Sequence, residues 1–99
     1  MTIIKKYVEA IESEISGAKE YAEKFVENKV RGDMQKASRY SEMANDELKH
    51  AMYEHEWAVK AVDEISKVYT PPEEMMEKWE KAHKIYVEEV ANIKHMLSL

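Results

Sequence analysis

Residues 29–35 read KVRGDMQ, and this stretch contains one of only two glycines in the chain. Gly32 can adopt the left-handed conformation that ends a helix, because it has no Cβ atom to clash with the backbone. Asp33 follows it, and an aspartate just before a helix accepts hydrogen bonds from the first free backbone N–H groups. The stretch therefore predicts that one helix ends near residue 31 and that another begins near residue 34.

A second division lies at residues 69–75, which read YTPPEEM and contain both prolines of the chain. We expect Thr70 to cap a third helix, Pro71 to take its first position and Glu73 to complete a capping box. The rest of the chain is rich in Ala, Glu, Lys and Met, which lose little side-chain freedom in a helix. The sequence therefore predicts an all-α protein, a single domain over residues 1–99, with helices at about 3–31, 34–69 and 71–97. Because the connections are short, we expect an antiparallel three-helix, up-down-up bundle.

Composition limits the classes of function. The chain has 44% hydrophobic and 35% charged residues, a formal net charge of −5 and no cysteine. This acidic balance argues against nucleic-acid binding, because no basic face would neutralise phosphates. No apolar run approaches the roughly 20 residues of a membrane helix, so we expect no membrane partner and a cytoplasmic location. Without cysteine, any metal would be held by carboxylates and imidazoles.

Helical periodicity directs three carboxylates and two imidazoles toward the predicted core. At about 100° per residue, Glu14 lies on the apolar stripe of the first helix, whereas its other acidic residues point away. Glu47, His50 and Glu54 lie within the stripe of the second helix, and His83 lies within that of the third. Unpaired buried carboxylates would cost many kcal/mol, so something must compensate their charge. A bound cation would do so, with Glu14, Glu47, His50, Glu54 and His83 as candidate ligands.

Each of these residues also has a structural interpretation without metal. A Glu with a His three residues later reaches one point on a helix face, but this spacing is common in acidic helices. Glu54 could instead pair with Lys36 or Lys60 near the bundle end, or lie at a subunit interface. His83 could form a hydrogen bond with Tyr86 or a carboxylate. We expect His55 and His95 to be solvated, and the methionines and tryptophans to pack in the core.

Two stretches of the sequence resemble a known family: EISGAKEYA, from Glu14 to Ala22, and ANDELKHA, from Ala44 to Ala51. Over roughly residues 7–60 the chain resembles the first half of a ferritin-like di-iron carboxylate domain, with rubrerythrins the nearest in character. The resemblance implies that Glu14 is a terminal carboxylate ligand, Glu47 a bridging carboxylate and His50 an imidazole ligand. The implied cofactor is a divalent metal, with iron first and manganese or zinc as alternatives.

The chain departs from this family because a complete ferritin-like site needs four helices. One solution resembles the encapsulated ferritins, in which two short chains each donate half of the ligands across a symmetric interface. The other solution is internal, with His83 presented at the level of the other four candidates. The length of the second helix favours a homodimer, because its apolar stripe, including Tyr40 and Met43 or Trp57 and Ala61, exceeds what shorter helices can cover.

Two hypotheses about function follow. The first is a ferritin-like metal-binding protein which, if it is an enzyme, oxidises Fe(II) or reduces dioxygen or peroxide as a ferroxidase-like or peroxidase-like oxidoreductase. The second is a non-enzymatic helical interaction module of phage or mobile-element type, which keeps the fold with or without a structural metal. Fold analogy supports the site more than the activity.

Overall fold

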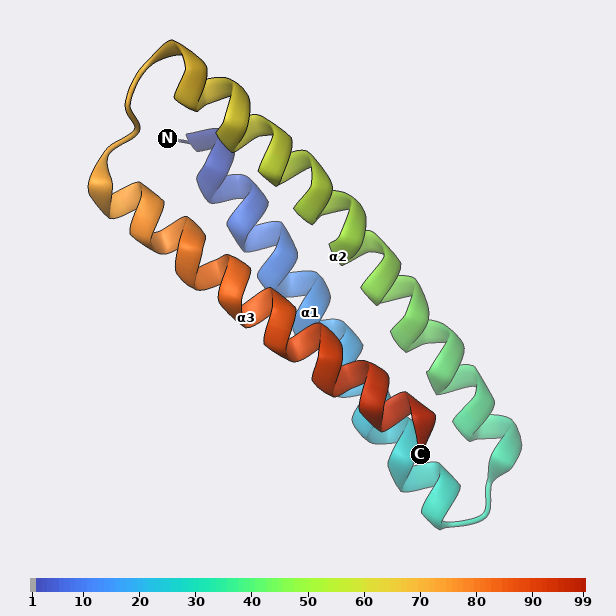
Figure 1. The fold of residues 1–99 in the computed structure, drawn as a ribbon. Coiled ribbons are helices and arrows are strands. Elements are labelled where there is room, and N and C mark those ends of the chain that lie inside the picture. Colours follow the sequence, from blue (N-terminus) through green and yellow to red (C-terminus); the bar gives the residue numbers. More distant parts are fainter. Residues whose placement is uncertain (1) are drawn as a thin grey trace.

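The computed structural model of the protein describes residues 2–99, which form three α-helices and no strand. The helices are α1 (Thr2–Val30), α2 (Met34–Val68) and α3 (Glu73–Ser98). The chain reverses direction at each connection, so the N-terminus lies beside the connection from α2 to α3 and the C-terminus beside the connection from α1 to α2 (Figure 1). The result is a rod with extents of 55 × 17 × 17 Å. The prediction of an all-α protein with three helices is confirmed.

The first connection forms as its residues predict. Gly32 has a positive φ of 85°, which an L-residue with a Cβ atom rarely adopts. The Asp33 side chain accepts a hydrogen bond from the backbone N–H of Lys36, with Oδ1 and N 3.1 Å apart. These two residues therefore turn the chain from α1 into α2 within three residues.

The second connection differs from the prediction. The N-cap of α3 is Pro72, which provides no side-chain hydrogen bond, so the expected capping box of Thr70 and Glu73 is wrong. The physical reason is the double proline: a residue before proline is sterically pushed out of the helical region, so Pro71 cannot begin a helix ahead of Pro72. Glu73 and Glu74 then occupy the first turn, where the helix dipole favours negative charge.

α1 lies between the other two helices and packs along both, whereas the backbones of α2 and α3 come close to each other at few points and meet mainly through side chains. Small side chains allow close packing of the α1–α2 pair, since Ala18, Ala22, Ala44, Ala51 and Ala58 have no exposed surface. Larger apolar side chains fill the remaining space. The core contains Ile4, Ile11, Ile15, Leu48, Trp79 and Ile93.

The apolar stripe predicted for α2 is only partly buried. Trp57 was expected in the core but is 53% exposed, and Met34 and Val68 are exposed as well. Leu48, by contrast, is only 4% exposed. The reason is that α2 carries two adjacent apolar rows, and α1 covers only one of them.

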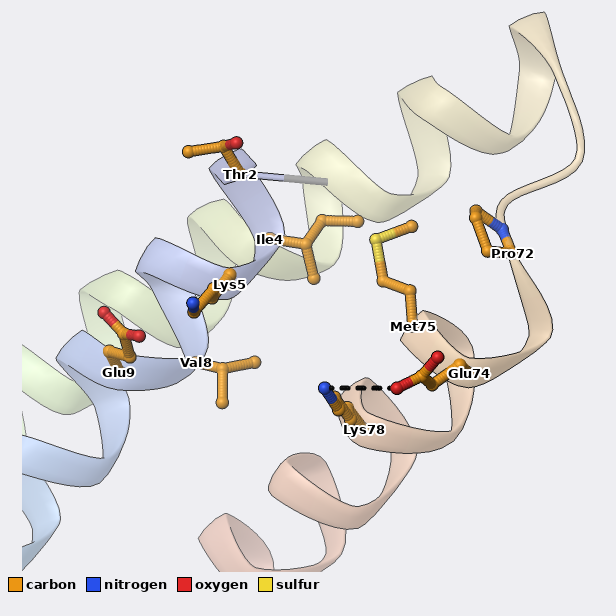
Figure 2. Close-up of a pocket in the computed structure, with 9 residues that line it drawn as sticks. All are labelled: Thr2, Ile4, Lys5, Val8, Glu9, Pro72, Glu74, Met75 and Lys78. Carbon is orange, nitrogen blue, oxygen red and sulfur yellow. Dashed lines mark ion pairs between the residues drawn. The ribbon is translucent and has the colours of Figure 1, made fainter.

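At one end of the rod, an open hollow of about 600 Å³ lies between the beginnings of α1 and α3. Figure 2 shows Ile4, Val8 and Met75 along it, and the ion pair of Lys78 with Glu74 at its edge. The charged groups of this hollow are on its rim and of both signs, so it presents no cluster of ligand atoms. None of the three helices is long and apolar enough, over residues 2–99, to cross a membrane.

Candidate metal centre

Glu14 of α1 meets Glu47 and His50 of α2 on one side of the rod. One ligand atom from each residue lies within 4.8 Å of the other two, and no other group of three histidine or acidic side chains in residues 2–99 is this close. The Nδ1 atom of His50 is 3.4 Å from Oε2 of Glu14 and 3.9 Å from Oε1 of Glu47. We call these three residues the carboxylate–imidazole cluster.

The spacing of the cluster fits a small divalent cation. Bonds of zinc to nitrogen and oxygen ligands are about 2.0–2.2 Å, so two atoms on the same ion lie at most about 4.4 Å apart. The two measured distances of 3.4 and 3.9 Å fall inside that limit. Two of the three ligand pairs thus already have a spacing that one ion allows, and all three atoms lie within 4.8 Å of one another.

Gly17 makes room for the carboxylate of Glu47. A Cβ atom at this position would lie 3.1 Å from Oε2 of Glu47, closer than most side-chain contacts. A glycine inside a helix costs about 0.5–1 kcal/mol relative to alanine, so its position one turn after Glu14 has a local cost. The carboxylate of Glu47 gains close access to α1 in return.

The two carboxylates of the cluster affect each other's protonation. A hydrogen bond with Glu14 raises the pKa of Glu47, and burial and the negative charge of Glu14 raise it further, while His50 opposes the shift. A hydrogen bond between two carboxyl groups requires a proton on one of them. The arrangement thus favours a proton, or a cation in its place, between Glu14 and Glu47.

The cluster is open on one side. The side chains of Glu14 and Glu47 are 26% and 29% exposed, but that of His50 is 55% exposed, so the expectation that His50 lies in the core is wrong. Glu12 and Ser16 of α1 line a hollow between α1 and α3. Glu14 is two residues from each of them, or about 200° around the helix, so its side chain points to nearly the opposite side of α1. The cluster therefore opens on the face of the α1–α2 pair that α3 does not cover, which we call the open face.

The other two candidate ligands lie outside the cluster. Glu54 is half-buried on α2, about one turn beyond His50. His83 of α3 instead forms a hydrogen bond with His55, with Nδ1 of His83 2.8 Å from Nε2 of His55. The internal arrangement, in which His83 joins the other four candidates, is not formed.

His55 is not a solvated surface residue, contrary to expectation. Its ring stacks on Tyr86 with centroids 4.0 Å apart, and it also contacts Trp79 and His83. Burial lowers the pKa of His55, and the neighbouring His83 lowers it further. We call His55, Trp79, His83 and Tyr86 the aromatic cluster. A sequence signal for it exists, because His55 follows Leu48 by seven residues and Ala51 by four, on the buried row of α2.

No protein-family model, curated protein or solved structure matches the chain. The resemblance to ferritin-like proteins therefore depends on the side chains themselves, above all Glu14, Glu47 and His50.

Proposed function

We propose that this chain is a ferritin-like protein that binds a divalent metal through Glu14, Glu47 and His50. The observation that carries the proposal is the meeting of these three side chains from two helices, with ligand atoms within 4.8 Å. Two further features support it. Gly17 leaves space for the Glu47 carboxylate, and the neighbouring Glu14 raises the pKa of Glu47, which favours a proton or a cation between the two carboxylates.

The donor atoms define the class of ion. Two carboxylates and one imidazole suit iron, manganese or zinc, with iron first by the family resemblance. Bound iron would supply redox chemistry with dioxygen or peroxide. The protein's own residues would hold the ion and orient it between α1 and α2. Three ligands leave positions on the ion open, and a second copy of the chain in a homodimer is the proposed source of the others.

Metal titration of matched variants tests this proposal. Isothermal titration with Mn(II), and with Fe(II) under anaerobic conditions, should show binding by the parent protein. Glu14→Ala should weaken the affinity at least tenfold, because it removes one of three ligands. Glu20→Ala is the control, since Glu20 lies on the same helix and pairs with Lys24 on the surface at 3.7 Å. Absence of binding by the parent, or equal losses in the two variants, would contradict the proposal.

A further inference from the structure

His55 and His83 bring two further imidazoles together, and the proposed metal centre uses neither of them. Nε2 of His55 on α2 lies 2.8 Å from Nδ1 of His83 on α3. The ring centroids are 4.9 Å apart, with 20° between the ring planes, so the two nitrogen atoms face each other. In a neutral pair, one of these atoms carries a proton and the other accepts it through a lone pair.

The ring of His55 is held in place, whereas the ring of His83 is accessible. His55 stacks on Tyr86 with 6° between the planes, and its ring also lies 5.9 Å from that of Trp79. His83 is exposed. Burial lowers the pKa of His55, and metal binding requires the neutral imidazole that this shift favours. The pair therefore combines one fixed nitrogen ligand with a second that an ion can reach from solvent.

The distance between the two nitrogen atoms fits one class of ion geometry. Neighbouring ligands on a square-planar or octahedral ion meet at a right angle, so bonds of about 2.0–2.1 Å place them about 2.8–3.0 Å apart. A tetrahedral ion would separate them by about 3.3–3.4 Å. The measured distance of 2.8 Å falls in the first range. The ion would lie beside the line that joins the two atoms, so the exposed ring of His83 would turn toward it while His55 stays on Tyr86.

The donor atoms and the local charge narrow the class of ion. Imidazole nitrogen suits Cu(II) and Ni(II), which favour square-planar or tetragonal sites, whereas Mn(II) favours oxygen. Glu56 follows His55 on α2 and is exposed. Its negative charge raises the pKa of His55 and of Tyr86, which shows that its charge reaches this side of the rod. The same charge favours a cation there.

We propose that His55 and His83 form a second metal site, which holds Cu(II) or Ni(II) where the side chains of α2 and α3 meet. The two imidazoles take neighbouring positions on the ion, each ring keeps its proton on its other nitrogen, and solvent occupies the remaining positions. The backbones of α2 and α3 come close at few points, so an ion shared by these two residues would hold α3 against α2. This site does not depend on the carboxylate–imidazole cluster.

Proton NMR of the imidazole rings locates the ion without a change at the site, because the chain has only four histidines. The protein carries no affinity tag, and His50→Ala disables the carboxylate–imidazole cluster. A substoichiometric amount of paramagnetic Cu(II) should broaden the ring signals of His55 and His83 and leave those of His95 sharp. His95 is also exposed on α3 and serves as the internal control. Equal broadening of all three histidines would overturn the site.

Titration with Ni(II) measures the affinity in the same His50→Ala protein. Adding His83→Gln should weaken binding at least tenfold, because glutamine supplies no imidazole nitrogen. His95→Gln is the matched control on α3 and should leave the affinity unchanged. Circular dichroism establishes whether the His83→Gln protein keeps its helix content. Equal affinities with His83→Gln and with His95→Gln would contradict the proposal.

Hydrogen exchange tests whether the ion joins the two helices. Saturating Ni(II) should slow amide exchange in α3 at least tenfold in the His50→Ala protein, because an ion bound only to the closed form opposes its opening. Exchange in α3 that Ni(II) does not change would overturn the role of the ion in holding α3. The outcomes also separate this site from the proposed function. Ni(II) binding that His50→Ala abolishes and His83→Gln retains would place the ion at the carboxylate–imidazole cluster and overturn the second site. A parent that binds Ni(II) through His83 but binds no Mn(II) or Fe(II) overturns the proposed function alone.

Discussion

Two histidines only five positions apart on α2 have opposite surroundings. His50 lies beside two carboxylates on the open face, with 55% of its side chain exposed. His55 points toward α3, where its ring stacks on Tyr86 and forms a hydrogen bond with His83. Both residues are imidazoles on the same helix, so the difference comes from what lies opposite each of them.

This difference separates two tasks on one helix. On the side that α3 covers, rings pack against rings, and the pKa of His55 is lowered because its charged form would lose hydration. On the open side, ligand atoms converge and remain accessible. We therefore expect the aromatic cluster to support stability and the carboxylate–imidazole cluster to support metal binding.

The largest effect is expected at Trp79, which is 8% exposed within the aromatic cluster. Trp79→Ala should lower the free energy of unfolding by about 3–5 kcal/mol, because it removes a large buried ring. In urea denaturation with a chelator present, His50→Ala should change that free energy by roughly 0.5 kcal/mol or less, as is usual for an exposed residue. Similar losses in the two variants would show that the two clusters do not divide stability from binding.

The next effect concerns the ion itself. Mn(II) at about 100 times its dissociation constant should stabilise the folded protein by about 2.7 kcal/mol. For a domain of this size, that corresponds to a rise in Tm of roughly 10–20 °C, measurable by circular dichroism. Glu47→Gln should abolish the rise. Glu42→Gln should retain it, because Glu42 is on the same helix but pairs with Arg39 on the surface.

Gly17→Ala should change stability and binding in opposite directions. Alanine favours a helix by up to about 1 kcal/mol, and the end of the Glu47 side chain can shift by a few tenths of an ångström to admit the new Cβ atom. The metal-free variant should therefore be slightly more stable in urea, whereas titration should show weaker Mn(II) binding. If the variant binds Mn(II) as tightly as the parent, the space that Gly17 leaves is not needed for the metal site.

The smallest effect is expected from the titration of His55. Because the pKa of His55 is lowered in the folded state, its neutral form contributes stability that is present above the unfolded pKa of about 6.5. That contribution should be lost as the pH falls below this value toward the folded pKa. Glu47 acts in the opposite direction, since its raised pKa favours the folded state as the pH falls, so the Glu47→Gln background isolates His55.

Urea midpoints between pH 5 and 8 measure this effect. His55→Gln should flatten the profile of the Glu47→Gln protein, whereas His95→Gln, at an exposed position on α3, should leave it unchanged. A profile that both substitutions alter equally would show that the surroundings of His55 do not control its titration.

Much of the fold follows from a few local signals. Gly32 and Asp33 mark one connection, and the two prolines mark the other. The predicted cap at Thr70 is wrong, because Pro72 keeps Pro71 out of the helical conformation. Glu14, Glu47 and His50 meet as their positions on two facing stripes predict. Periodicity was sufficient here because α1 and α2 are sequential antiparallel neighbours with a short connection.

The rest depends on which neighbour covers each side of a helix, and periodicity does not contain that information. His83 was expected among the apolar residues of α3, but it is exposed and forms a hydrogen bond with His55 rather than meeting the carboxylates. Trp57 lies at a position where helical periodicity predicts a core residue. It is half exposed in the structure because no other helix of the same chain covers that side of α2.

The position of α3 has a consequence for local unfolding. Because the backbone of α3 lies mainly beside α1 and meets α2 chiefly through the aromatic cluster, α3 can detach as a unit when that cluster opens, while the α1–α2 hairpin stays paired. Amide hydrogens of α3 should then exchange with solvent through an opening of lower free energy than those of α1. All three residues of the carboxylate–imidazole cluster belong to the hairpin, so an ion would bind the opened and the closed forms alike. Metal should therefore slow hydrogen exchange in α1 and α2 while leaving exchange in α3 almost unchanged.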